Sequence, residues 1–146
     1  MKATATRMSK AELEARARFR RELRQFERAS EEAARAHEVT WAQYQLLLQV
    51  GGMPGRDWAL VGELATALAL RQHTTVELID RCEAAGLVER TREEDDQRKV
   101  RISLTALGRR KLNAVAVAQG REIAHLLEVV RGAIGQAAGP GPGDSD

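Results

Sequence analysis

Hydrophobic side chains recur with a spacing of three or four residues over most of the chain, which is typical of helices that bury one face. In the first segment the apolar stripe runs from Phe19 towards His37, and arginines occupy the other faces. Ser9 and Glu12 have the spacing of a capping box, and no Gly or Pro interrupts the residues behind them. This pattern predicts one long amphipathic helix within residues 9–39.

Three shorter helices are expected next. Thr40 and Gln43 form a second capping box, and the apolar segment that follows ends at Gly51–Gly52. A turn rich in Gly and Pro then leads into a helix over Leu60–Leu68. A helical pattern predicts a further helix at about residues 72–85, and the glycine directly behind it can end that helix. The last two helices would flank a tight turn.

The periodicity changes to alternation in residues 87–104. Two alternating stretches flank a charged loop there, which predicts a β-hairpin. Thr105 can cap a last long helix at residues 106–137. Residues 138–146 are rich in Gly and Pro and are expected to form a disordered tail.

A helix, a tight turn, a second helix and a hairpin follow one another in a winged helix-turn-helix. We therefore expect a mostly α protein with a small β-hairpin wing, in which residues 40–105 form a DNA-binding lobe. The recognition helix would be the one at 72–85, and the wing would be the hairpin at 87–104. Long amphipathic helices expose more apolar surface than a small lobe can cover, so residues 9–39 and 106–137 are predicted to be dimerisation helices of a homodimer.

Composition narrows the choice of class. With 146 residues, 43% of them hydrophobic and 30% charged, the chain suits one compact domain. The formal net charge is only +2, so charge alone does not identify a nucleic-acid binder. No apolar signal peptide and no stretch long enough for a membrane helix is visible. A cytoplasmic protein without a membrane partner is expected.

Enzyme chemistry is not expected. Three scattered histidines, one cysteine and the lack of a glycine-rich phosphate loop give no convergent catalytic group, so neither a cofactor nor a metal site is predicted. The lone Cys82 cannot form an internal disulfide and suits a reducing compartment. We expect it in the core, since free cysteine is among the most buried residue types, with redox sensing as the alternative.

The expected DNA contacts lie on the recognition helix and on the wing. The side chains able to read base edges are Gln72, His73, Thr74 and Glu77, and those able to reach phosphates or the minor groove are Arg71, Arg81, Arg98 and Lys99. The alternative for His73 is a solvated surface residue, and for Glu77 it is an interaction with the helix dipole. Three more wing arginines, Arg90, Arg92 and Arg101, could lie along the same backbone, and Asp96 is expected to orient Arg98.

Several segments, in this order and with this spacing, resemble the motif string of MarR-type regulators. They are Thr40–Tyr44, Gly62–Ala65, Val76–Arg90, Asp96–Arg98 and Leu104–Gly108. The resemblance implies an obligate dimer built from both terminal helices and a palindromic double-stranded operator read by two recognition helices. It also implies a wing whose Arg98 tracks the minor groove. Many such regulators lose DNA affinity when a small phenolic or anionic compound binds between the dimer and DNA-binding lobes.

The resemblance also points to a region for such an effector. It corresponds to His37, Trp41 and Tyr44, for which plain core packing is the alternative. The start of the recognition helix, Arg71–Thr74, is bulkier and more polar than the small residues often found there, so a different operator is expected. Peroxide sensing through a cysteine near the first helix is not expected, because that segment contains none.

The leading hypothesis is therefore a dimeric, sequence-specific DNA-binding transcriptional regulator, in the form of a repressor that a small ligand releases. The alternative is a winged-helix module that binds other proteins and has no specific DNA binding, because fold does not fix function. The polar and basic character of the predicted recognition helix favours DNA.

Overall fold

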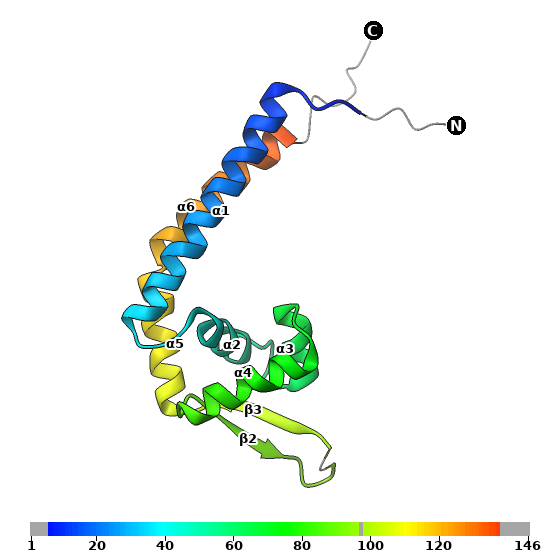
Figure 1. Cartoon of the computed structure of the whole chain (residues 1–146), viewed down its shortest axis with the longest axis vertical. Helices are drawn as coiled ribbons and strands as arrows, with labels where there is room; N and C mark the ends of the chain where they lie inside the picture. The colour runs from blue at the N-terminus through cyan, green and yellow to red at the C-terminus, as the bar shows by residue number, and fades with distance from the viewer. Residues whose placement is uncertain (1–5, 97, 138–146) are drawn as a thin grey trace, which may run out of the picture. The chain divides into compact units, whose positions relative to one another are not determined.

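The computed structural model describes residues 6–96 and 98–137, and the tail predicted at 138–146 lies outside them. The described part is mostly helical with one small sheet, as expected from the sequence (Figure 1). In chain order its elements are α1 (Lys10–Ala36), α2 (Trp41–Gly51), β1 (Trp58–Leu60), α3 (Val61–Leu68), α4 (Gln72–Ala84), β2 (Val88–Arg92), β3 (Val100–Leu104), α5 (Ala106–Ala118) and α6 (Gly120–Ala137). No described helix has both the length and the apolar character needed to cross a membrane.

The chain divides into two compact units. One unit is Ser30–Ala118, and the other joins the residues up to Ala29 with those from Gln119 onward. The first contains the sheet, the short helices and the end of α1. The second consists of most of α1 and of α6.

The core of the unit Ser30–Ala118 is built around α2. The buried apolar residues of this core are Ala34, Val39, Tyr44, Leu46, Leu47, Val50, Ala59, Leu64, Leu78, Ile79, Cys82, Leu87, Val88, Ile102, Leu112 and Val115. Because α2 carries apolar side chains on several sides, it can contact α3, α4, α5 and β3 at the same time. Burial of these aliphatic groups is the main stabilising term of the unit.

Both capping boxes expected from the sequence are present. At the start of α2 the Gln43 N–H donates to Thr40 Oγ1 (3.1 Å) and the Thr40 N–H donates to Gln43 Oε1 (2.9 Å). At the start of α1 the Glu12 N–H donates to Ser9 Oγ (3.1 Å) and the Ser9 N–H donates to Glu12 Oε2 (2.6 Å). These side chains satisfy N–H groups that have no partner inside the helix.

Replacing Thr40 by alanine is expected to lower the free energy of unfolding by about 1 kcal/mol, because the N–H of Gln43 loses its acceptor. Chemical denaturation of the two proteins measures the difference. Thr40→Ser keeps the hydroxyl and serves as the matched control, with a stability close to that of the parent chain. Equal losses in both variants would show that the methyl group of Thr40, and not its cap, stabilises α2.

The sheet has three strands where the sequence predicted two. β2 and β3 form the expected hairpin, with Arg90 opposite Ile102, and β1 pairs antiparallel with the other edge of β3. The segment Leu60–Leu68 was predicted as one helix, but Leu60 ends β1 and α3 begins only at Val61. A strand of this length is too short to show alternation, and it is formed by pairing with residues far along the chain.

The helix predicted at 106–137 is divided. α5 ends at Ala118, α6 begins at Gly120, and the Ile123 N–H donates to the Gln119 carbonyl (3.1 Å) in the first turn of α6. Gly120 has nothing near the position of a Cβ, so crowding does not require a glycine here. Its low helix propensity explains why the continuous helix predicted from apolar spacing is broken at this point.

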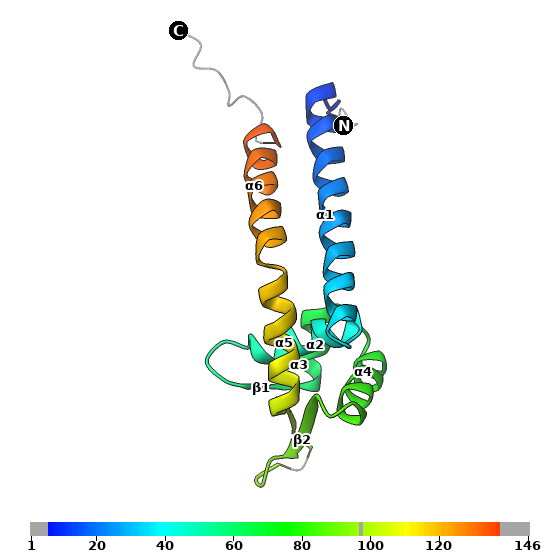
Figure 2. The same ribbon diagram turned by 90° about the vertical axis from the view of Figure 1, so that its left-hand side faces the viewer.

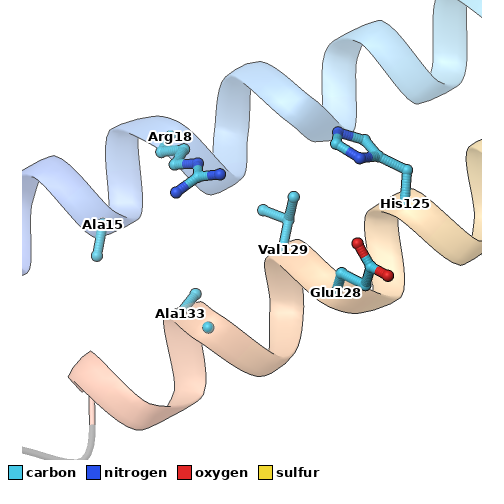
Figure 3. Close-up of a pocket in the computed structure, with 7 residues that line it drawn as sticks. Ala15, Arg18, His125, Glu128, Val129 and Ala133 are labelled. Atoms are coloured by element: carbon cyan, nitrogen blue, oxygen red, sulfur yellow. The ribbon is translucent and has the colours of Figure 1, made fainter.

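Within the second unit, α1 and α6 run alongside one another (Figures 1 and 2). His125 of α6 lies 3.0 Å from Glu22 Oε2 of α1, and Val129 is buried between the helices. A hollow of about 170 Å³ next to this pair is lined from both helices, with Arg18 and Glu128 among its lining residues (Figure 3). Its wall is thus partly charged, which is unlike the aliphatic core of the other unit.

Candidate nucleic-acid interface

The helix-turn-helix is formed by α3, a tight turn and α4. Ala69 ends α3 in the left-handed conformation (φ 53°), and the Leu70 N–H donates back to the Ala65 carbonyl (3.0 Å). Arg71 is extended and precedes the first residue of α4. Inside α4, the Thr75 hydroxyl donates to the Arg71 carbonyl (2.9 Å) and fixes the first turn. The chain therefore turns between the two helices without a glycine.

α4 has one buried and one exposed side. Its buried residues are Thr75, Leu78, Ile79 and Cys82. Because successive residues turn by about 100° around a helix, His73 and Glu77 lie on the side opposite to this buried set. Both side chains are exposed. A polar face of this kind suits hydrogen bonding to base edges.

The structure brings most of the predicted recognition-helix residues to the surface. Arg71, Gln72, His73, Glu77 and Arg81 are all exposed. Thr74 was predicted as a base-reading residue but is only half-exposed. It lies beside the buried Thr75, at the edge of the face that packs on the core.

The wing cations are held at the turn between β2 and β3. Arg98 and Lys99 are both exposed, and the Arg98 side chain is 93% exposed. The Arg98 Nε donates to Asp96 Oδ1 (3.2 Å), as expected from the sequence. The same carboxylate oxygen accepts from the Arg98 N–H (3.0 Å). An ion pair this exposed is weak, so Arg98 can exchange Asp96 for a phosphate at little cost.

Two of the wing arginines have other partners. Arg90 of β2 reaches back to α4, where it donates to Asp80 and, over 2.8 Å, to Glu83 Oε1. Arg101 of β3 donates to Glu93 Oε1 over 2.9 Å. The expectation that both could lie along DNA is not supported by these contacts, because each guanidinium is engaged within the protein.

The contact between β2 and α4 was not predicted from the sequence; we name it the Arg90 clasp after Arg90, Asp80 and Glu83. Asp80 and Glu83 lie three residues apart and so share one face of α4, and Arg90 follows two strand positions after the buried Val88. That spacing was a usable signal. A single strand residue can face either side of a sheet, however, so the pairing required the register of β2 and β3.

Cys82 is fully buried in the core, which agrees with the expectation from the sequence. Burial raises the pKa of its thiol to about 12. The thiolate is the reactive form of cysteine, so this site is poorly suited to redox sensing.

A thiol reagent such as iodoacetamide is therefore expected to leave Cys82 unmodified in the native protein and to modify it completely in denaturant. Intact-mass spectrometry over a time course measures both reactions, and the denatured sample is the control for reagent activity. Rapid modification of the native protein would favour the redox alternative.

The three residues predicted to contact an effector have different surroundings. Tyr44 is buried in the core, and its ring stacks on that of Trp41, with ring centroids 5.7 Å apart. Trp41 packs against the same core, and both Trp41 and His37 are half-buried. Burial raises the pKa of the Tyr44 hydroxyl above its ordinary value. Core packing thus accounts for Tyr44 and for much of Trp41.

Within the described residues, no three His, Cys, Asp or Glu side chains are grouped as a metal site. The arrangement instead offers an exposed polar helix face and an exposed pair of wing cations on one unit. Hydrogen bonding and charge contacts are what these groups can supply.

Comparisons with known proteins agree with this geometry. The MarR family model matches residues 37–99. The HTH-type transcriptional regulator TtmR from Methylorubrum extorquens is 38% identical over 84 residues, which cover 58% of this chain and 42% of that relative. The match thus spans about two fifths of the curated relative's length.

Solved structures extend the similarity beyond the central segment. A MarR family protein from Bacillus stearothermophilus is 30% identical, with a TM-score of 0.67 and coverage of 84% of each chain. A mutant MarR from E. coli, complexed with operator DNA, is 20% identical, with a TM-score of 0.63 and coverage of 77% of each chain. The second likeness concerns the fold, whereas the first has enough identity and coverage to show kinship. The chain belongs to the MarR family.

Proposed function

We propose that the protein is a homodimeric transcriptional regulator that binds specific double-stranded DNA. The observation that carries the proposal is the exposed polar face of α4, next to a wing whose turn presents Arg98 and Lys99 to solvent. The fold is similar to that of the E. coli MarR mutant complexed with operator DNA. Fold similarity alone does not fix function, so these exposed side chains are the main support.

In this proposal each part of the surface has a distinct role. The face of α4 with His73 and Glu77 enters the major groove, where donor and acceptor patterns distinguish all base pairs. Gln72 at the start of the helix reads an adjacent position. Arg71 and Arg81 contact phosphates and fix the register. Arg98 and Lys99 contact the minor groove or its backbone.

Homodimerisation is supported by apolar side chains that remain exposed in the unit formed by α1 and α6. Leu13 is 52% exposed, Leu127 50% and Ile123 41%. Apolar side chains gathered on two long helices favour burial against another surface, and a second copy gives a two-fold arrangement suited to a palindromic operator. Sedimentation equilibrium should give twice the chain mass of 16.1 kDa.

We further propose that the protein is a repressor that a small effector releases from DNA. Its proposed location is the cytoplasm. Tyr44 is buried, so a phenolic or anionic effector would meet the half-buried Trp41 and His37 first. Such a ligand can act only through different affinities for the DNA-competent and the DNA-incompetent dimer. Tryptophan fluorescence of Trp58→Phe, in which Trp41 is the remaining tryptophan, measures ligand binding, and its comparison with DNA release in the same titration measures that difference.

The function is tested by titrating the protein on the DNA upstream of its own gene at two salt concentrations. Binding should be stronger than to random DNA and should weaken steeply with salt, since phosphate contacts release counterions. Arg98→Ala should reduce affinity by about tenfold and make the salt dependence shallower. Arg20→Ala removes the same charge from an exposed site on α1 and serves as the matched control, with near-parent affinity.

The winged-helix protein-interaction module is the second candidate. It would be favoured by equal, weak affinity for every DNA tested and by equal effects of Arg98→Ala and Arg20→Ala. The polar α4 face argues against it, since protein-binding surfaces are usually richer in aromatic and aliphatic side chains at their centre.

A further inference from the structure

One face of the three-stranded sheet packs on the core, and the other carries a row of charged and aromatic side chains. Ala59 of β1 and Ile102 of β3 lie opposite each other and are both buried in the core. Side chains alternate along a strand, so Trp58 and Arg101 lie on the other face. Neither residue belongs to the DNA contacts proposed above.

Two guanidinium groups lie over the ring of Trp58. The Cζ of Arg101 is 3.9 Å from the ring centroid, and the Cζ of Arg56 is 4.3 Å from it. Both distances are within the range of cation–π attraction, for which Trp is the best aromatic partner. The indole therefore links the segment before β1 to β3.

Each of the two arginines is also held by a carboxylate. Arg56 donates to Glu63 in the first turn of α3, and Glu63 also accepts from the Leu60 N–H (2.9 Å). The hydrogen bond from Arg56, together with that from Leu60, holds the pKa of Glu63 below its ordinary value. Arg101 donates to Glu93 Oε1 over 2.9 Å.

These side chains form one continuous series of contacts, which we name the Trp58 brace. In order, it consists of Glu63, Arg56, Trp58, Arg101 and Glu93. The brace begins at the start of α3, in the helix-turn-helix, and ends at the first residue after β2. The carboxylates balance the charge of the two arginines, so the two cations can be close to one indole.

The far end of the brace lies at the turn that carries the wing cations. The Glu93 N–H donates to the Lys99 carbonyl (3.1 Å), and the Lys99 N–H donates to the Asp96 carbonyl (3.0 Å). A restraint on Glu93 is thus transmitted to Lys99, the neighbour of Arg98. The Arg98 side chain itself is almost fully exposed and depends on its backbone for its position.

We propose that the Trp58 brace positions the wing: it orders the turn with Arg98 and Lys99 before DNA arrives, without itself touching DNA. The inference rests on the proposed DNA-binding function. A turn that is already ordered loses less conformational freedom on binding, so the brace raises DNA affinity. Trp58 is then a positioning residue, and its loss affects the wing before it affects the rest of the unit.

The test uses Trp58→Leu in the full chain, because this change removes the aromatic face and leaves the net charge unaltered. Amide hydrogen exchange of the free protein measures order in β2 and β3, and a DNA titration measures affinity. Exchange in the wing should become about tenfold faster, while amides of α2 and α4 keep their rates. The dissociation constant for DNA should rise about five- to tenfold.

Two further variants separate positioning from general stability. Trp58→Phe keeps an aromatic face for the guanidinium groups and should restore most of the wing protection and most of the affinity. Trp41→Leu removes the chain's other tryptophan from its place against the core and should destabilise the unit without a selective effect on the wing. Should Trp58→Leu fail to fold, Arg101→Met, at the sheet surface, replaces it in the exchange experiment.

Unchanged wing exchange in Trp58→Leu, or an equal acceleration throughout the unit, would overturn the proposal. Faster wing exchange with unchanged DNA affinity would also overturn it, since ordering would then have no consequence for binding. The parent protein could also show no preference for any DNA while Trp58→Leu shows faster wing exchange. That result would support the ordering of the wing by the Trp58 brace and would refute the proposed function. Exchange is measured without DNA, so the two failures are distinguishable.

Discussion

Gly108→Ala is expected to destabilise the protein by more than about 3 kcal/mol, which is a large part of the stability of an ordinary domain. A Cβ at this position would lie 1.9 Å from the Leu87 carbonyl oxygen and 2.9 Å from its carbon. The obstacle is backbone, which cannot rotate away as a flexible side chain can. α5 would have to move off the segment before β2.

The surrounding hydrogen bonds make that movement costly. The Thr105 N–H donates to the Leu87 carbonyl (3.1 Å), and the Thr105 hydroxyl donates to the Gly86 carbonyl. The Gly108 N–H in turn donates to Thr105 Oγ1 (3.0 Å). Separating α5 from Leu87 therefore breaks the two hydrogen bonds that Thr105 donates to the segment before β2.

Thermal denaturation measures the effect, with an expected fall in Tm of about 10 °C or more. Gly62→Ala is the matched control, because it makes the same change in helix α3, where a Cβ meets nothing within 4 Å. That variant should be as stable as the parent or slightly more stable, since alanine has the higher helix propensity. Similar losses in both variants would contradict the close approach of α5 to Leu87.

Arg90→Met is expected to lower DNA affinity by about tenfold or more while costing only about 1 kcal/mol of stability. The Arg90 clasp is partly solvated: the side chain of Arg90 is 27% exposed, and that of Asp80 is 58% exposed. Its contribution to folding is therefore modest. Its loss, however, frees α4 from β2 and leaves two carboxylates without their cation on a helix proposed to approach phosphates.

A charge-restoring variant identifies the cause of the lost affinity. Adding Asp80→Asn to Arg90→Met brings the net charge of the Arg90 clasp back to that of the parent and should regain most of the affinity if repulsion dominates. If this variant still binds DNA weakly, the lost affinity comes from a changed orientation of α4. Arg20→Met, which removes a charge from α1, controls for net charge, and an equal loss there would contradict a special role for the Arg90 clasp.

Features set by neighbouring residues were predictable from the sequence. The capping boxes at Ser9 and Thr40 and the glycine stop behind α4 depend on residues within one helical turn, and the structure contains them. Gly86 has φ 74°, and the Leu87 N–H donates to the Cys82 carbonyl (2.9 Å) there. The winged-helix fold class followed from the order of such local elements.

Features set by distant residues were not predictable in the same way. β1 exists because Trp58 and Leu60 pair with Ser103 and Arg101, more than 40 residues later. The end of α3 at Leu68 agrees with the prediction, but the left-handed conformation of Ala69 behind it was not predictable, because alanine rarely takes it. Gly120 was a sequence signal for the break between α5 and α6. The prediction of one continuous helix gave more weight to the apolar spacing on both sides of this glycine.

The candidate site follows the same division. Exposure of Gln72, His73 and Glu77 could be predicted, because it depends on which face of α4 is apolar. The partners of Arg90 and Arg101 could not, because a row of charges does not say which carboxylate each arginine meets. The sequence allowed both arginines to lie along DNA, and both are engaged within the protein.

Selection of binding sites from random double-stranded DNA measures whether a dimer reads DNA with two α4 helices, and it requires no knowledge of neighbouring genes. We expect enrichment of an inverted repeat whose half-site centres are about 10 base pairs apart, the spacing of successive major grooves on one side of DNA. The enrichment should be weaker in Arg98→Ala, which loses a backbone contact but keeps both α4 helices, and unchanged in Arg20→Ala. A pool that stays random, or a single half-site without its inverted copy, would contradict a dimer that reads DNA with two α4 helices.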